Sequence, residues 1–329
     1  MGKNFFVILF ILWVSRAHGL LLSWPTVISP LTKNATRRID ECIQRTESGK
    51  LESGKFGFVR ENGTKFHGGI DIKSFLKNGN GTPSDSVHAF MDGQVVYRNT
   101  SPNASNYGCY IILAHPYFLT LYAHLASIDV EVGQSVRAGQ KIGVLGKTSN
   151  ATKIPNERAH LHFEIDFQLG DGDHFAHWYG ANFTDKNLHG AFNGLNLVGI
   201  DPIAAVEKLI GGVKPIDLFV AEKEAMTLRI MGNYVPQFLE KYAPLVAKDV
   251  DLTRPVKGWI IEFTWFGLPK KWTPIYNSDS EQPRLKLLSY RKSLLRNAVL
   301  REVLREKNGS VSMGPRTIHT LKKMGFIVD

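Results

Sequence analysis

Four histidines and one aspartate have the residue types and spacing that suit a metal centre. His67 and Asp71 are four positions apart with two glycines between them, so the backbone can turn sharply and aim both side chains at one point. His160 and His162 are two apart in a strand-like stretch, which puts both rings on one face. Imidazole and carboxylate are ligands that Zn²⁺ prefers, and a catalytic zinc keeps three protein ligands and one open position. The spacing predicts zinc held by His67, Asp71 and one histidine of the pair.

The other imidazole of the pair would then be free for proton transfer, together with His124 in the sequence Tyr-Ala-His-Leu (122–125). Each half of this pattern is weak alone, because an isolated H-x-H is more often a surface or packing pair than a pair of ligands. The joint occurrence of both halves, each in a strand-like context, favours the chemical interpretation.

Short β-type runs separated by Gly, Asn and Pro turns must position these residues. The runs predict strands at 86–90, 93–97, 109–114, 119–124 and 160–167. Glycines punctuate pairs of apolar residues between 130 and 145, which predicts tight hairpins there. Short helices are expected at 37–45 and 203–210. Residues 168–198 show little periodicity and predict a long surface loop.

Several motifs in this region resemble the lysostaphin-type, or LytM-like, zinc endopeptidases, which cut peptides of bacterial peptidoglycan. The resemblance covers about 56–210, nearly half of the chain. Its motifs are H-x-G-x-D (67–71), Asp92-Gly93 with Val95, Tyr107-Gly108 before Ile111–His115, Tyr-Ala-His-Leu (122–125), the G-x-x-V-x-x-G-x-x-I-G hairpin (133–143), His-Leu-His-Phe-Glu (160–164) and Asp201-Pro202.

The resemblance implies that His67, Asp71 and His162 bind one Zn²⁺ per chain, and that His124 and His160 are catalytic. It also implies a mainly β fold: a small antiparallel sheet or half-barrel of the duplicated-hybrid-motif type, followed here by an α+β region. The implied partner is peptidoglycan or its peptides. The segment between Phe167 and Asp201 is longer than the compact version of the family has, so the substrate groove is expected to be reshaped.

The first residues predict export. Lys3 precedes an apolar run from Phe5 to Val14, and Ala17-His18-Gly19 is similar to a signal cleavage site. About ten strongly apolar residues are too few for a membrane span, which needs about twenty. We therefore expect a signal peptide at 1–19, a secreted or periplasmic protein and no transmembrane span after cleavage. An uncleaved anchor extended through Leu22 is the alternative.

The predicted domain limits are an N-terminal segment at 20–52, the peptidase domain at 53–212 and a basic C-terminal region at 213–329. The whole chain has a net charge of +10, and residues 213–329 hold 20 Lys and Arg against 12 Asp and Glu. A basic surface favours anionic partners such as wall polymers, whereas no nucleic-acid motif is present. Apolar spacing from Leu285 to Arg305 predicts an amphipathic helix, with arginines on its other face.

Two alternatives stay open on sequence alone. Cys42 and Cys109 could form a disulfide in an exported protein or remain two buried thiols. The domain could also be a non-catalytic zinc-binding scaffold that acts as a regulator or signal. Such a scaffold could lose His124 or His160 without harm to the fold, and this chain keeps both.

Overall fold

The computed structural model describes residues 14–17, 20–30, 37–151, 153–218, 222–247, 250–251, 253–277, 284–295 and 302–328. Contacts between Cα atoms divide the chain into two compact units. Unit 1 comprises 1–54, 71–116 and 120–163, and unit 2 comprises 55–70, 117–119 and 164–329. Most of the predicted signal peptide lies outside the described residues.

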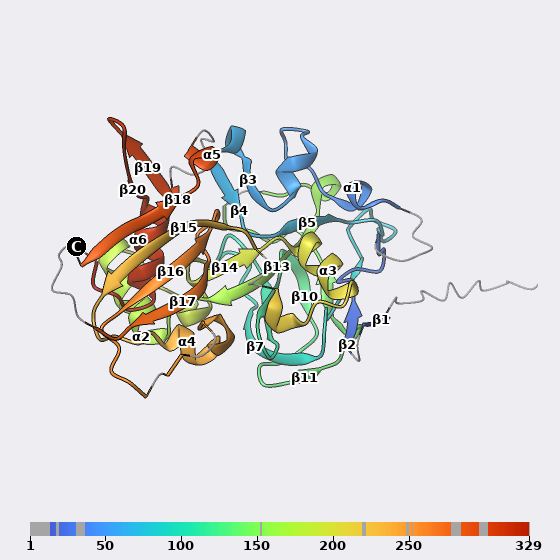
Figure 1. Cartoon of the computed structure of the whole chain (residues 1–329). Helices are drawn as coiled ribbons and strands as arrows, with labels where there is room; N and C mark the ends of the chain where they lie inside the picture. Colours follow the sequence, from blue (N-terminus) through green and yellow to red (C-terminus); the bar gives the residue numbers. More distant parts are fainter. Residues whose placement is uncertain are drawn as a thin grey trace, which may run out of the picture. The chain divides into compact units, whose positions relative to one another are not determined.

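The largest sheet carries most of the predicted strands (Figure 1). Its order is β11 (Ser135–Val136), β7 (Gly93–Asn99), β8 (Tyr110–Ala114), β9 (Leu119–Ala123), β13 (His160–Gln168) and β14 (Leu197–Ile200), and β5 (Ile70–Lys73) also pairs with β13. The sequence Tyr-Ile-Ile-Leu of β8 is apolar throughout and fully buried, as expected for a strand covered on both faces. The predictions of strands at 93–97, 109–114, 119–124 and 160–167 are confirmed.

Smaller sheets complete the first part of the chain. A three-stranded sheet has the order β10 (Leu125–Ile128), β12 (Lys141–Leu145) and β6 (Ser86–His88). Two hairpins join β1 (Val14–Ala17) to β2 (Leu20–Ser23) and β3 (Gly57–Arg60) to β4 (Lys65–His67). The predicted short helices appear as α1 (Ile39–Cys42) and α3 (Pro202–Ile210), and the Asp201 carboxylate caps α3 by accepting from two backbone N–H groups.

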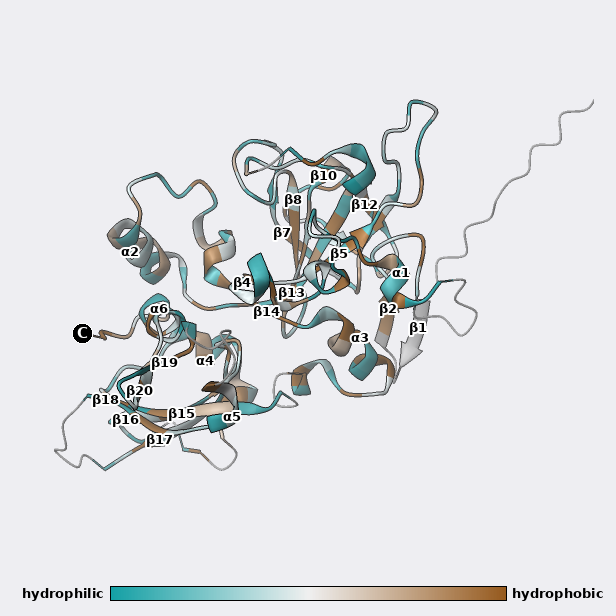
Figure 2. Ribbon diagram, turned by 90° about the horizontal axis from the view of Figure 1, so that it is seen from above, coloured by the Kyte–Doolittle hydropathy of each residue, from teal (hydrophilic) through white to brown (hydrophobic). Residues whose placement is uncertain are grey.

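The last part of the chain is built on a four-stranded antiparallel sheet in the order β17 (Pro269–Ile275), β16 (Gly258–Thr264), β15 (Glu224–Met231) and β18 (Leu285–Tyr290). Apolar residues alternate along β15 (Figure 2), and β16 contains the apolar run Trp-Ile-Ile. The remaining elements are α2 (Gly172–Asn182), α4 (Gln237–Lys241), α5 (Lys292–Leu295), α6 (Pro315–Lys323) and the hairpin of β19 (Leu304–Lys307) with β20 (Ser310–Met313).

Two predictions of local structure are wrong. Residues 285–290 form strand β18 instead of the start of a helix, because pairing with β15 sets Leu285 opposite Ile230 and Leu287 opposite Leu228; residues 296–301 of the predicted helix lie outside the described part. The segment 168–198 is not only a loop. It contains α2, which buries Phe175, Trp178 and Tyr179 at helical spacing.

The predicted fold class is confirmed: a mainly β protein with antiparallel sheets, in which an α+β region follows the peptidase-type strands. The predicted domain limits stay a prediction. Cys42 and Cys109 are both buried free thiols, so the disulfide alternative is wrong for this structure. In the described ranges, no helix combines the length and the apolar character that crossing a bilayer requires.

Candidate metal centre

His67 is the last residue of β4, and the β3–β4 hairpin orients its ring. Its Nδ1 lies 2.8 Å from the carbonyl oxygen of Lys55, so Nδ1 carries the proton and donates to that carbonyl. The lone pair is therefore on Nε2, where an Arg60 guanidinium nitrogen donates over 2.9 Å. Nε2 is the atom of His67 that can bind a metal, and a metal ion would compete with Arg60 for it.

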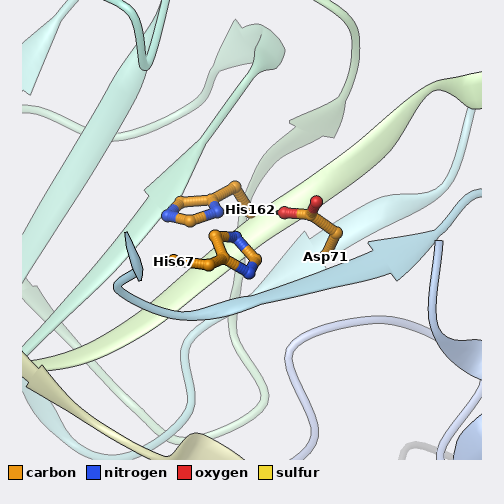
Figure 3. A group of neighbouring side chains, drawn as sticks. All are labelled: His67, Asp71 and His162. Carbon is orange, nitrogen blue, oxygen red and sulfur yellow. Dashed lines mark hydrogen bonds and ion pairs between the residues drawn. The ribbon is translucent and has the colours of Figure 1, made fainter. Parts of the chain in front are cut away.

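Asp71 and His162 come from the neighbouring strands β5 and β13. The Asp71 Oδ1 atom lies 3.0 Å from His162 Nδ1. Ligand atoms of His67, Asp71 and His162 all lie within 4.8 Å of one another, and these residues are only 3%, 2% and 6% exposed. Figure 3 shows both rings and the carboxylate gathered in one place. Two imidazoles and one carboxylate at these distances suit Zn²⁺.

Strand β13 carries its titratable residues on one face. Leu161, Phe163, Ile165 and Phe167 are fully buried on the opposite face, which fixes the register of the strand. His160 and His162 therefore project to the same side. The His160 Nδ1 atom donates to the carbonyl of Arg158 over 2.7 Å, and His160 Nε2 lies 3.6 Å from Asp71 Oδ1.

His124 lies between β9 and β10 in the left-handed backbone region, with φ of 62°. A non-glycine residue there costs roughly 1–2 kcal/mol, so the surrounding structure must hold it. The backbone N–H of His124 donates to the Tyr107 carbonyl over 2.8 Å, and its Nδ1 donates to the Thr148 carbonyl over 2.7 Å. Its ring centroid lies 4.8 Å from that of His160.

Burial and the nearby His160 and His162 hold the pKa of His124 well below its ordinary value. The ring is consequently neutral near pH 7. Because Nδ1 donates to a carbonyl, Nε2 is the basic atom. His160 has the same arrangement of a carbonyl at Nδ1 and a lone pair on Nε2. The structure thus brings together all five residues that the sequence singled out, in two sets: His67, Asp71 and His162, and the pair His124 and His160.

Two buried acidic residues continue the same face of β13. A Cβ on Gly68 would lie 2.8 Å from Glu164 Oε1, so glycine at this position lets the carboxylate approach the backbone beside His67. Burial, and secondly the neighbouring Glu164, raises the pKa of Asp166 well above its ordinary value.

The remaining histidines have other environments. His115 is buried, with Nδ1 donating to the Asp92 carbonyl over 2.8 Å and Nε2 2.8 Å from Thr120 Oγ1, so both ring nitrogens have partners within the fold. His174 is paired with Asp171 at 2.7 Å near the start of α2. His189 is buried.

Sequence reasoning missed Arg60 and Thr148. Arg60 contacts His67 across the β3–β4 hairpin, and its position seven residues earlier carries no helical or strand periodicity that could signal the contact. Thr148 acts through its backbone carbonyl on His124, 24 residues away. A carbonyl acceptor has no signature in residue type, so only the folded chain reveals it.

Residues 65–174 match the profile of Peptidase family M23. This part of the chain is therefore an M23-type domain. Over 100 residues it is 38% identical to the peptidoglycan DD-endopeptidase ShyA of Vibrio cholerae, an alignment that covers 30% of this chain and 20% of that protein. Over 124 residues it is 35% identical to the murein hydrolase activator NlpD of Escherichia coli, covering 37% and 27%.

The M23 domain is also similar to the catalytic domain of the antimicrobial peptidase lysostaphin from Staphylococcus simulans. The identity is 30%, over 34% of this chain and 75% of that one, with a TM-score of 0.26. The matched region amounts to only 20% to 27% of the length of the two curated relatives.

Proposed function

We propose that the protein is a zinc-dependent endopeptidase that hydrolyses stem or cross-bridge peptides of bacterial peptidoglycan. The single observation that carries the proposal is the convergence of His67, Asp71 and His162 within 4.8 Å, beside two more imidazoles. These three residues would hold the Zn²⁺, one per chain. When bound, the ion supplies Lewis acidity that lowers the pKa of water and polarises the scissile carbonyl.

His124 and His160 handle the protons. Each donates from Nδ1 to a backbone carbonyl, which fixes the ring and leaves Nε2 as the base. One of the two accepts the proton from the attacking water and passes it to the leaving amine. The other would take up a proton from solvent at Nε2 and donate it as a hydrogen bond to the negative charge that develops on the scissile carbonyl oxygen. The low pKa of His124 keeps its Nε2 available near neutral pH.

The match to an endopeptidase named for peptidoglycan supports this substrate class. We also propose the signal peptide at 1–19, a secreted or periplasmic location, and a peptidase domain at 53–212 that includes the M23 domain. The basic region at 213–329 would contact anionic wall polymers.

A second candidate is a regulator without catalysis, because the relative NlpD is named as a murein hydrolase activator. Retention of both His124 and His160 beside the metal residues favours the enzyme, since a binding scaffold does not need two further imidazoles there.

The test uses purified peptidoglycan and the full chain, treated with chelator and then reloaded with zinc. Soluble muropeptides should appear with the zinc-loaded protein, disappear with chelator and return on reloading. His160→Ala should abolish release while zinc stoichiometry stays near one. Release that persists with chelator and in His160→Ala would contradict the zinc mechanism, and absence of release from every wall type tested would favour the regulator.

A further inference from the structure

A charged pocket of about 570 Å³ lies within unit 1, beside the strand that carries Asp71. Its volume is that of an ordinary ligand site. Most of its lining comes from 37–51, a segment that precedes the M23 match at 65–174. Lys73 of β5 and Glu157 complete the lining.

Two residues that line the pocket are close in sequence to residues of the proposed metal centre. Lys73 follows Asp71 by two residues on β5, so the two side chains share a face about 6–7 Å apart along the strand. The backbone N–H of Gln44 donates to the Asp71 carbonyl over 2.8 Å, which fixes the segment 37–51 against the same strand. Glu157 is three residues before His160.

An exposed ion pair links the two walls. Arg158, next to Glu157, contacts the carboxylate of Glu47 at 2.5 Å. A backbone N–H of Thr46 donates to Ser53 Oγ over 3.0 Å within the same segment. These contacts connect the segment 37–51 to the stretch that carries Glu157.

The charges of the pocket favour a carboxylate. Four cations line it: Arg37, Arg38, Arg45 and Lys73. Only Arg38 has an ion-pair partner among the described residues, Glu41 at 3.6 Å. Arg37 lies 4.6 Å over the Phe75 ring, and Arg45 donates to the Gly49 carbonyl over 3.2 Å. Those contacts position both guanidinium groups without neutralising them, and a guanidinium binds carboxylate in a bidentate manner.

The carboxylates that line the pocket make a polyanionic ligand unfavourable. Asp40, Glu41 and Glu157 also line it, and they would repel a chain of phosphates. A peptide that carries both a free carboxylate and an amino group fits the mixed charges better, with Glu157 as a partner for the amino group.

We propose that this pocket is a substrate subsite that binds the free carboxylate of a peptide, beside the strand that carries Asp71. The inference rests on the proposed function, since it names the part of the peptide that this chain recognises. Because the lining comes mainly from 37–51, the recognition belongs to this chain and not to the M23 domain alone.

The test measures binding of a fluorescent stem-type tetrapeptide by anisotropy, as the free acid and as the C-terminal amide. The full zinc-loaded chain carries His124→Ala to prevent turnover. The free acid should bind about tenfold more tightly than the amide, the usual effect of one charge-assisted contact. Lys73→Gln and Arg45→Gln should each remove that preference, and Lys73→Arg should retain it. Arg137→Gln, at an exposed position outside the pocket, is the matched control and should change nothing.

The outcomes separate this inference from the proposed function. Equal binding of acid and amide, no measurable binding of either, or an unchanged preference in both Lys73→Gln and Arg45→Gln would overturn the subsite even if peptidoglycan is cut. Stronger binding of a phosphate-containing wall polymer at the same residues would overturn it too. A carboxylate preference that depends on Lys73 would support the subsite even if no wall type is cleaved.

Discussion

Replacing Thr148 by valine should loosen the support of His124. The Thr148 hydroxyl accepts from the Cys109 backbone N–H over 2.8 Å and donates to the Leu125 carbonyl over 3.0 Å. Valine has nearly the same shape but removes the hydrogen-bond partner of both backbone groups. Each backbone group that water cannot reach then destabilises the folded protein by about 1–3 kcal/mol. Thr148 is half-buried, so water will relieve part of the cost. We expect a loss of about 2–4 kcal/mol.

The same substitution should lower kcat, because the Thr148 carbonyl is the acceptor for His124 Nδ1 and the backbone around it will shift. Urea denaturation measures the stability, and hydrolysis of soluble muropeptides measures kcat and KM separately. Thr148→Ser is the matched control: it keeps the hydroxyl and should stay within about 1 kcal/mol of the parent. If valine matches the parent in both stability and kcat, the proposed support of His124 is refuted.

Three further predictions concern packing, pH and the thiols. Gly199→Ala should lower the free energy of unfolding by about 1–3 kcal/mol or more, because the new Cβ would lie 2.2 Å from the backbone oxygen of Gly68. Gly180→Ala in α2 is the control: its Cβ meets nothing within 4 Å, so denaturation should show a neutral or slightly stabilising change. Burial lowers the pKa of His115 from 6.5 to about 4, so His115 takes up a proton in the unfolded chain at a higher pH than in the folded protein. Its contribution to the free energy of unfolding is complete above pH 6.5 and falls by about 3 kcal/mol towards pH 4. His115→Gln should flatten this part of the plot of unfolding free energy against pH, and an unchanged plot would rule out His115 as the cause. Cys42 and Cys109 are both buried, and burial raises the pKa of the Cys42 thiol to about 11. A thiol reagent at neutral pH should therefore detect no cysteine in the native protein and two after denaturation. Detection of none in denaturant would show that the two cysteines form a disulfide.

The strands and the site residues could be predicted from the sequence because the patterns that identify them lie within single short segments. Alternation in β13 and the apolar run in β8 are period-two patterns that survive without tertiary information. The H-x-H pair is informative for the same cause, because a strand puts residues i and i+2 on one face. The five site residues could therefore be named before any contact was known.

The rest depended on contacts between distant parts of the chain. Strand pairing with β15 overrode the helical spacing of 285–290. The role of Gly68 follows from Glu164, almost one hundred residues later, and a turn-based explanation could not include it. The pocket beside Lys73 is formed by residues with no common motif, and their charges gather only after folding.

The most direct test of the central claim is to measure which bonds of peptidoglycan the zinc-loaded protein breaks. Labelling of new α-amino groups and of new reducing sugar ends in the soluble products distinguishes a peptidase from a glycan-cleaving enzyme. The account predicts new amino groups without new reducing ends, and loss of this signal in His67→Ala and Asp71→Ala. New reducing ends alone, or amino groups released equally by those two variants, would contradict it.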